Sequence, residues 1–426
     1  MNDTGLLAST LAHAFPVDAV PDWHAAARRA ALERFLAEGL PKSRLEEWKY
    51  TSLDHLEGAA LHPPATAGQE NVCVDVTAYP GHVLSFDNGQ LACHGTWLSS
   101  QLAGTLGHLG DTRPVREHLG RLAGGTVLAS LNLALWRDGA RVYVPRGERL
   151  GIPVFAVHAV SEADAMLHPR TLAVLEEGSQ AVLVEHFLGN TPHAYWQNAV
   201  TEIVLEQGAS LVHVRVVEEG EAATHTSLTS VRMGRDSQYS VLHVGLAGGL
   251  ARHDLVVELA APGAVAHVDA LEIAQGRRHA DLHLRLDHQA RQTSSRITWR
   301  GMADARGHAI FDGHVVVGRA AHQTDARQSC RGLLLSPHAE VDAMPRLEIY
   351  ADDVKCGHGA SIGNLDAEAL FYLRSRGIEP PEARRLLLEG FAGEALGLLQ
   401  DTHLGDWLMP RLLPALAGGA GKAMPR

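Results

Sequence analysis

The chain has 426 residues, of which 46% are hydrophobic and 20% are charged, and its formal net charge at pH 7 is −12. A chain of this length predicts two or three compact units with ample core. The negative charge argues against a nucleic-acid partner bound through its phosphates, and no window is apolar for long enough to cross a membrane.

The start of the chain lacks the basic and apolar regions of a secretory signal. The cysteines are scattered along the chain, which is not the pattern of a disulfide framework; they are Cys73, Cys93, Cys330 and Cys356. We therefore expect a cytoplasmic protein whose thiols are reduced.

Residues 22–39 have the spacing of an amphipathic helix, which Asp22 can cap and Gly39 can end. Shortly after this helix come two aromatic residues, Trp48 and Tyr50. We predict that they are anchors that dock this segment on the rest of the protein.

Two further features lie in the first third of the chain. Residues 58–69 are rich in Ala, Gly and Pro and predict a linker. The pair Asn88-Gly89, inside the run 83–91, is a strong signal of a β-hairpin. We expect residues 1–125 to form a mixed, partly helical N-terminal region.

From about Val142 to Tyr350 the sequence consists of short β-rich runs broken by Gly and Asp. Turn glycines recur within it about every 30 residues, at Gly147, Gly178, Gly208, Gly234 and Gly263. Units of this size cannot bury their own apolar faces, so the period predicts a stacked solenoid, and the strand composition makes it a β-helix. We place this core at residues 126–360. The alternative is a β-sandwich in which the hairpin spacing is coincidental.

The 26 histidines are dispersed and form no His-rich tract. The densest group lies in residues 279–288, where His279, Asp281 and His283 alternate with alanine and leucine. This alternation is typical of a half-buried strand. We therefore predict that these histidines form a solvated face and are not metal ligands.

Beyond the β-rich part the chain becomes helical. Asp366 is suited to cap a first helix and Gly377 to close it, and Pro380-Pro381 is suited to start a second. The apolar side chains that follow are too many for a few helices to hide among themselves, which predicts docking on the solenoid or on a partner. They are Leu386, Leu387, Phe391, Leu398, Leu399, Leu404, Trp407, Leu408, Leu412 and Leu413. We expect residues 361–426 to form a C-terminal helical domain with a disordered tail from Gly418.

The candidate functional residues are Cys356 and His358, which lie two residues apart among glycines. A strand would place the thiol and the imidazole on the same face, and both groups suit iron, zinc and sulfur chemistry. An iron–sulfur cluster needs about four such ligands, so a metal site here must be completed from outside this segment. The structural alternative is that Cys356 is a small buried hydrophobe and His358 a hydrogen-bonded turn residue.

Residues 347–364 together with 365–378 closely resemble the C-terminal signature of the SufB/SufD family, the scaffold subunits of the Suf iron–sulfur cluster assembly machinery. The run 46–51, Glu-Glu-Trp-Lys-Tyr-Thr, resembles the N-terminal motif of the same family. Both motifs are closer to the SufD side than to the SufB side. Shorter runs of the β-rich part also resemble the family; they are residues 309–314, 321–328 and 333–336.

The sequence departs from the family pattern at three positions. Asp312, Cys330 and Gly332 stand where the family more usually has asparagines. A ladder of asparagines at a β-helix bend satisfies backbone groups, so its partial loss is expected to change local packing more than function. Cys330 is not included among the candidate ligands.

The resemblance implies a right-handed parallel β-helix flanked by helical ends. It implies a heterodimer with a SufB-type paralogue, and a SufC-type ATPase bound through the C-terminal helices. It also implies an iron–sulfur cluster or iron that is held transiently and completed by the partner, at a shared interface site that includes Cys356 and His358. A homodimer of the isolated chain is a further expectation, and a flavin in the complex is left open.

The resemblance implies no catalytic triad, and the sequence contains no P-loop. We therefore predict that the chain is not an enzyme. Two other classes of protein are alternatives to a scaffold. A carbohydrate-active β-helix enzyme is disfavoured by the aromatic content of only 5% and by the missing export signal. A stand-alone metal-binding β-helix protein would be supported by stoichiometric metal on the isolated chain.

Overall fold

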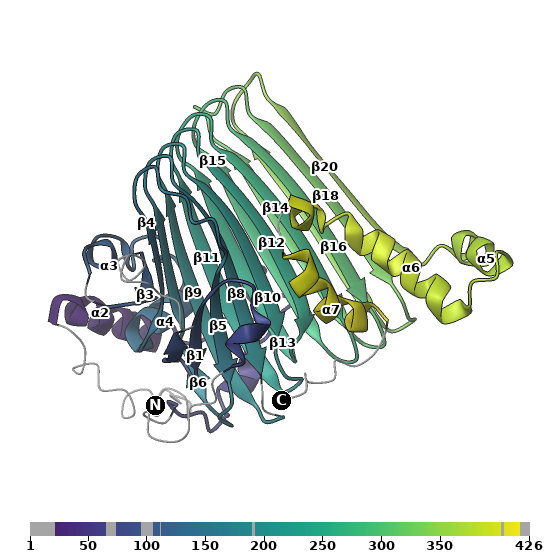
Figure 1. Ribbon diagram of the computed structural model, residues 1–426, viewed down its shortest axis with the longest axis horizontal. Coiled ribbons are helices and arrows are strands. Elements are labelled where there is room, and N and C mark those ends of the chain that lie inside the picture. Colours follow the sequence, from purple (N-terminus) through teal and green to yellow (C-terminus); the bar gives the residue numbers. More distant parts are fainter. Residues whose placement is uncertain are drawn as a thin grey trace.

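The computed structural model describes residues 22–64, 74–94, 105–110, 112–189, 192–401 and 404–417. The protein is mainly β, with 45% strand and 21% helix, and it forms a β-solenoid of about eight turns with helices near both ends (Figure 1). The predicted β-helix is confirmed. The sandwich alternative is wrong, because successive turns stack as parallel strands, such as β10 on β12 and β11 on β13.

The front sheet, which faces the viewer in Figure 1, follows the strand order β2-β1-β5-β8-β10-β12-β14-β16-β18-β20. Its strands are β1 (His82–Asp87), β2 (Gln90–His94), β5 (Val154–Val160), β8 (Gln180–Gly189), β10 (Ser210–Glu218), β12 (Gln238–Ala247), β14 (Val265–Ala274), β16 (Ser294–Ala303), β18 (Asp325–Leu334) and β20 (Lys355–Asn364). Only the pairing of β1 with β2 is antiparallel within this order. This pair is the predicted hairpin, and Asn88 and Gly89 both have positive φ at its turn, 48° and 75°.

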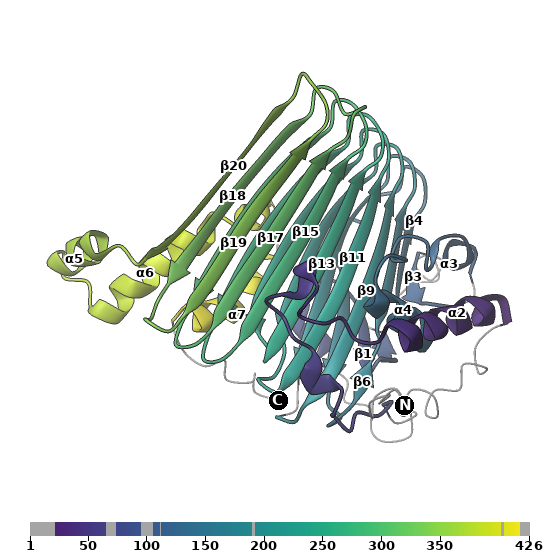
Figure 2. The same ribbon diagram turned by 180° about the vertical axis from the view of Figure 1, so that it is seen from behind.

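The back sheet, seen in Figure 2, follows the order β19-β17-β15-β13-β11-β9-β7-β4-β3, with β6 beside β9. Its strands are β3 (Leu106–His108), β4 (Gly139–Val144), β6 (Met166–Leu167), β7 (Arg170–Leu175), β9 (Tyr195–Leu205), β11 (Ala223–Met233), β13 (Leu250–Leu259), β15 (His279–His288), β17 (His308–Val317) and β19 (Glu340–Ile349). The chain alternates between the two sheets, so each turn of the solenoid supplies one strand to each sheet.

The main core lies between the two sheets and is built from stacked rows of side chains. Val241, Val268 and Ile297, for example, are register partners on β12, β14 and β16, and each is at most 2% exposed. A period of two along each strand and an in-register stack across strands together produce such rows.

The turn glycines of the repeat adopt the left-handed backbone that favours glycine at four of five positions, with φ of 66° to 79°. These are Gly147, Gly178, Gly208 and Gly263. At the fifth turn the left-handed residue is Asp236, with φ of 54°, and not Gly234. The predicted period of about 30 residues is therefore confirmed, but Gly234 is not the left-handed residue of its turn.

The N-terminal helices lie on the back sheet. Helix α2 (Asp22–Glu38) is followed by Gly39 with φ of 71°, as predicted. Helices α3 (Arg113–His118) and α4 (Val127–Leu135) follow β3 in the chain. Helices α2 and α4 pack together, and their apolar side chains share a cluster with Trp48 and Trp196.

The strap, residues 41–56, runs along the outer face of the back sheet (Figure 2) and contains the short helices η2 (Glu46–Trp48) and η3 (Asp54–Leu56). The Arg252 guanidinium lies 3.8 Å from the centre of the Trp48 ring, and Tyr50 contacts Met344 and the ring of His308. The prediction that Trp48 and Tyr50 anchor this segment is confirmed.

The strap changes the prediction for strand β15. Its apolar residues face the core, as expected, but Asp281 on the opposite face has no exposed surface. The Thr51 hydroxyl donates a hydrogen bond to Asp281, and Arg252 lies 3.2 Å from the same carboxylate. This face is therefore partly covered, since Asp281 is buried, Thr51 also contacts His279, and the His283 side chain is only 13% exposed. The prediction that these histidines form a solvated face is wrong.

The C-terminal helices are α5 (Ala367–Ser375), α6 (Pro380–Gly393) and α7 (Gly405–Leu416). The short helices η4 (Val76–Ala78) and η5 (Gly397–Asp401) share a hydrophobic cluster with α6, α7 and the front sheet. Helices α6 and α7 pack on the outer face of the front sheet, whereas α5 projects past the last strand (Figure 1). The predicted cap is present, because the Asp366 carboxylate accepts hydrogen bonds from the backbone N–H groups of Glu368 and Ala369.

The apolar stripe of α6 was predicted only in part. Leu386 is 37% exposed, whereas the residues of α6 that are buried are Ala383, Leu388 and Ala392. Residues 418–426, predicted to be a tail, lie outside the described residues, as do residues 65–69 of the predicted linker. The divisions at residues 125 and 360 stay predictions; the last strand of the solenoid ends at Asn364.

Candidate functional site

Cys356 and His358 lie on β20, the last strand of the front sheet. Their register partners on β18 are Ala326 and Gln328, which are both buried on the core side of the sheet. Cys356 itself packs against the main core cluster. The thiol and the imidazole therefore share the inner face of the strand, as the spacing of two predicts.

The two side chains differ in exposure. Cys356 is half-buried, and His358 is exposed because no further strand covers it. Burial raises the pKa of the Cys356 thiol, and the carboxylate of Asp325 adds to the rise. A thiol in this state is a poor nucleophile by itself, and a metal ion bound to the sulfur would favour loss of the proton.

Cys330 lies one strand earlier on the same inner face and differs from Cys356. It is 1% exposed, and burial raises its pKa to about 12. It packs in the main core cluster together with Trp299. Cys330 is thus a core side chain, whereas solvent can reach the thiol of Cys356.

The end of the solenoid that carries this pair is open. Among the described residues, β20 pairs only with β18 and β19 only with β17, so each ten-residue strand has one edge without a described partner strand. Apolar side chains remain uncovered at this end: Ile349 is 44%, Tyr350 58% and Ile362 46% exposed. Long edge strands with exposed apolar residues are templates for pairing with another chain.

The outward face of β20 is rich in glycine. Glycines hold three of its five positions, Gly357, Gly359 and Gly363, beside Lys355 and Ser361, and a Cβ atom built on any of these glycines would meet nothing within 4 Å. Glycines at alternate positions of a strand allow another backbone or a ligand to approach closely.

The described part of the chain contains no group of three or more His, Cys, Asp or Glu side chains placed to hold a metal ion. Cys356 and His358 therefore provide at most a partial ligand set. Their role as ligands stays a prediction.

One departure from the family pattern has a clear structural consequence. Asp312 on β17 forms an ion pair with Arg346 on the neighbouring strand β19, with contacts of 2.6 and 2.9 Å. The Asp312 side chain is 8% exposed and that of Arg346 is 47% exposed. This pair ties the last strand of the back sheet to the one before it.

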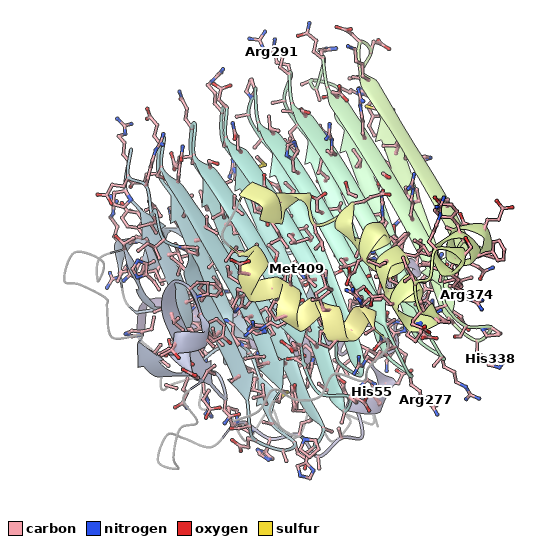
Figure 3. The ribbon with its side chains drawn as sticks, turned by 45° about the vertical axis from the view of Figure 1, so that its right-hand side comes forward. His55, Arg277, Arg291, His338, Arg374 and Met409 are labelled. Carbon is pink, nitrogen blue, oxygen red and sulfur yellow. The ribbon has the colours of Figure 1, made fainter. Side chains whose placement is uncertain are left out.

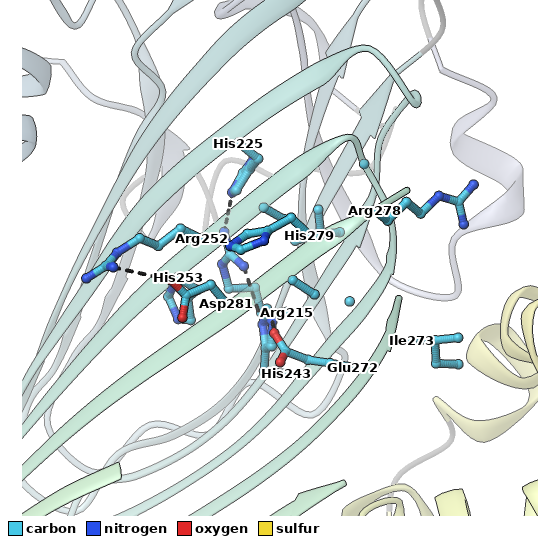
Figure 4. Close-up of a pocket in the computed structure, with 15 residues that line it drawn as sticks. Arg215, His225, His243, Arg252, His253, Glu272, Ile273, Arg278, His279 and Asp281 are labelled. Carbon is cyan, nitrogen blue, oxygen red and sulfur yellow. Dashed lines mark hydrogen bonds and ion pairs between the residues drawn. The ribbon is translucent and has the colours of Figure 1, made fainter. Parts of the chain in front are cut away.

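Sequence reasoning missed a polar cluster inside the solenoid, drawn in Figure 4. Arg215 is 1% exposed and donates hydrogen bonds to His225 at 2.5 Å and to Ser227 at 2.7 Å. The rings of His243 and His253 stack beside it with centroids 5.1 Å apart. Burial, helped by the charge of Arg215, holds the pKa of both histidines well below the usual value.

Glu272 completes this cluster from β14. It accepts a hydrogen bond from the Trp299 indole at 3.2 Å, and burial raises its pKa to about 8. A cavity of about 20 Å³ lies between these side chains, which is room for one water molecule. The cluster is a buried hydrogen-bonding network. One sequence signal could have revealed this cluster. On β10, His213 and Arg215 alternate with valines in a strand that is buried on both faces.

No helix among the described residues is both long and apolar enough to cross a membrane.

Comparison with known proteins agrees with this architecture. Residues 158–391 match the family model described as "SUF system FeS cluster assembly, SufBD core domain". An iron–sulfur cluster assembly SufBD family protein of Synechocystis is 31% identical, over 87% of this chain and 86% of its own length. The iron–sulfur cluster assembly protein SufD of Escherichia coli is 28% identical, over 91% of this chain and 92% of its own. The chloroplastic protein ABCI7 of Arabidopsis thaliana is 29% identical, over 89% and 83%. The chain therefore belongs to the SufBD family of iron–sulfur cluster assembly proteins.

Proposed function

We propose that this protein is a non-catalytic scaffold subunit that pairs with a SufB-type subunit through the open end of its solenoid. The observation that carries the proposal is the bare pair of edge strands β19 and β20, one of which holds Cys356 and His358. A partner strand added at this edge would satisfy the free backbone groups and cover Ile349 and Ile362.

Nascent iron–sulfur clusters would form at this interface as cargo of the complex. Cys356 and His358 would supply two soft ligands, and the partner would supply the remainder of about four. We place this work in the cytoplasm, where reduced thiols are available. When no partner is present, two copies of this chain could cover the same edges of each other.

The ligand proposal is tested by maturation of a cluster on the complex. Cys356→Ser and His358→Ala should each reduce the cluster absorbance of the co-expressed complex and leave its composition unchanged. His338→Ala is the matched control, because His338 is exposed in the turn before β19. Full cluster content in both site variants would refute the role of this pair and leave the structural alternative.

A second part of the proposal concerns helix α5. No residue of α5 is buried, and Phe371 and Tyr372 are 72% and 56% exposed. This helix projects from the molecule (Figure 1), and it lies in the segment that resembles the family. We propose that α5 is the docking element for a SufC-type ATPase, with an interface on the order of 1,000 Å².

Dimerisation of two such ATPases, one on this chain and one on the partner, would pull on both helical ends. Helix α6 transmits this force to the front sheet, because Glu394 at its end contacts both Arg300 and Arg331. The interface between the solenoids would then open or close around Cys356 and His358. The scaffold would convert nucleotide binding into access for iron and sulfur without hydrolysing anything itself.

Substitution is a better test of this docking than truncation after Asn364. Truncation would remove α6 and α7 and uncover the apolar outer face of the front sheet. Phe371→Ala with Tyr372→Ala should abolish ATPase co-purification and spare pairing with the SufB-type subunit. Leu386→Ala, on the exposed side of α6, is the control. An undiminished affinity for the ATPase in the double variant would place its binding site elsewhere.

A further inference from the structure

A cationic hollow lies on the outer face of the front sheet, at the start of the last three strands. Helices α6 and α7 cover the other half of this face and leave these strand starts uncovered (Figures 1 and 3). The hollow measures about 750 Å³, which is within the usual size range of small-molecule sites. Its lining residues are Arg296, Ile297, Thr298, Arg327, Gln328, Ser329, Lys355, Cys356, Gly357 and His358.

The positive charges of the hollow lie side by side. Arg296 on β16 and Arg327 on β18 are register partners, and Gly357 on β20 is next in the same row. Lys355 is two positions before Gly357 and therefore on the same outer face. Arg296, Arg327 and Lys355 are all exposed. Like charges at paired positions destabilise a sheet, so this arrangement has a cost that a bound anion would offset.

Carboxylates neutralise this group only in part. Arg327 pairs with Asp325 at 3.1 Å, and both of these side chains are exposed, at 67% and 41%. In the described part of the chain, neither Arg296 nor Lys355 has a carboxylate within ion-pair distance, although Asp269 on β14 attracts Arg296 from further away. No carboxylate of the residues that the structure describes lines the hollow, on a protein whose net charge is −12.

The floor of the hollow is shaped for close approach. Gly357 has no side chain, and a Cβ there would meet nothing within 4 Å. Ser329 pairs with Gly359, the next outward residue of β20, and accepts a contact from Arg300 at 3.4 Å, which leaves its hydroxyl hydrogen to donate to a ligand. Two guanidinium forks, an ammonium group and a hydroxyl donor thus surround a flat strip of backbone.

We propose that this hollow binds a small phosphate-bearing molecule. Planar guanidinium groups match the several oxygens of a phosphoryl group by paired hydrogen bonds. The volume leaves room for an organic part beyond the phosphate. Cys356 and His358 also line the hollow, but the period of two places their side chains on the opposite face of β20, so a ligand here would reach the site strand from behind the thiol.

Titration calorimetry of the full chain with inorganic phosphate, pyrophosphate and citrate tests the assignment. We expect saturable binding of pyrophosphate with one site per chain, and weaker binding of inorganic phosphate. The double variant Arg296→Gln, Arg327→Gln should weaken pyrophosphate binding about tenfold or more, since it removes two charge-assisted contacts. Arg277→Gln with Arg291→Gln, two exposed turn arginines labelled in Figure 3, should leave the affinity unchanged.

Three results would overturn the proposal. One is the absence of saturable pyrophosphate binding to the chain. Another is binding that the double variant retains in full while its circular dichroism stays native. The third is citrate binding as tight as pyrophosphate binding, which would make the hollow a general anionic patch. If phosphate and pyrophosphate bind equally well, the ligand is free phosphate; if pyrophosphate is preferred, the ligand is a larger phosphoester.

Discussion

The two ends of the solenoid are built from the same kind of turn and finish in opposite ways. At the first end, β1 and β4 are covered by the antiparallel strands β2 and β3, and Leu84 and Leu106 are each 1% exposed. At the last end, no strand in the described part of the chain covers β19 or β20, and Ile349 and Ile362 are 44% and 46% exposed. Repeat proteins normally end in capping units. The bare end is the feature on which the proposed pairing with another chain rests.

The largest expected effect is at the capped end. Leu84→Ala removes a side chain from the main core, and it should lower the free energy of unfolding by about 2–5 kcal/mol. Urea denaturation followed by circular dichroism measures this change. Folded protein carrying the substitution should still pair with a SufB-type subunit at native affinity. Loss of pairing without loss of stability would mean that the capped end is also an interface.

The next effect concerns a buried histidine in the capped half. The His158 ring is stacked between Phe86 and Phe187, with centroids 5.0 and 5.1 Å away, and neither ring nitrogen has a hydrogen-bond partner in the described chain. Burial lowers its pKa to about 4. Because the folded pKa is below the unfolded value of 6.5, its contribution to stability is present above pH 6.5 and is lost as the pH falls toward 4.

His158→Phe should remove that loss, which is about 3 kcal/mol for a group with this shift. Urea midpoints at pH 7 and pH 4.5 measure it, and the variant should depend less on pH than the natural protein does. His338→Phe, at an exposed position, is the control and should keep the natural pH dependence. Equal pH dependence in His158→Phe and in the natural protein would show that protonation of His158 does not destabilise the fold.

A substitution at the bare end should have the opposite effect to Leu84→Ala: it should weaken pairing and leave stability nearly unchanged. Ile362→Lys places a charge on the uncovered apolar surface, and it should weaken pairing with a SufB-type subunit about tenfold or more while changing the free energy of unfolding by less than about 1 kcal/mol. Analytical ultracentrifugation of the mixed subunits measures the affinity. His338→Lys adds the same charge in the turn before β19 and controls for net charge. Native affinity in Ile362→Lys would contradict pairing through this end.

The sequence allowed the turns of this fold to be predicted better than its ends. Gly147 and Gly178 mark left-handed turn positions, a local requirement that a sequence displays directly. No local pattern shows that β20 is the last strand or that His358 is uncovered. Both depend on whether a later segment adds another strand, and none of the described residues after β20 does. The spacing of Cys356 and His358 gave their common face, but nothing local gave their exposure.

The buried polar groups were missed for a related reason. Alternation along one strand assigns polar residues to the outside, and Arg215 and Glu272 are on the inside because their partners come from other turns of the solenoid. Asp281 is covered by the strap, which is more than two hundred residues away in sequence. On α6, Leu388 is buried and Leu386 is exposed because the helix packs its Leu388 side against the front sheet. Contacts of this range cannot be read from a local pattern.

The smallest expected effect is at the start of α5, beyond the bare end. The Asp366 carboxylate caps this helix by accepting from two backbone N–H groups, at 2.9 and 3.1 Å, and Asp366→Ala should cost about 1 kcal/mol of local helix stability. No residue of α5 is buried, so this loss should leave the unfolding of the solenoid unchanged and appear as faster hydrogen exchange at Glu368 and Ala369. Asp366→Asn keeps a capping side chain and should exchange nearly as slowly as the natural protein.

Since a frayed α5 must be ordered before it can dock, the alanine variant should also bind a SufC-type ATPase several-fold more weakly. If the exchange accelerates while ATPase affinity stays native, α5 is not the docking element, and the end of the solenoid serves one partner instead of two.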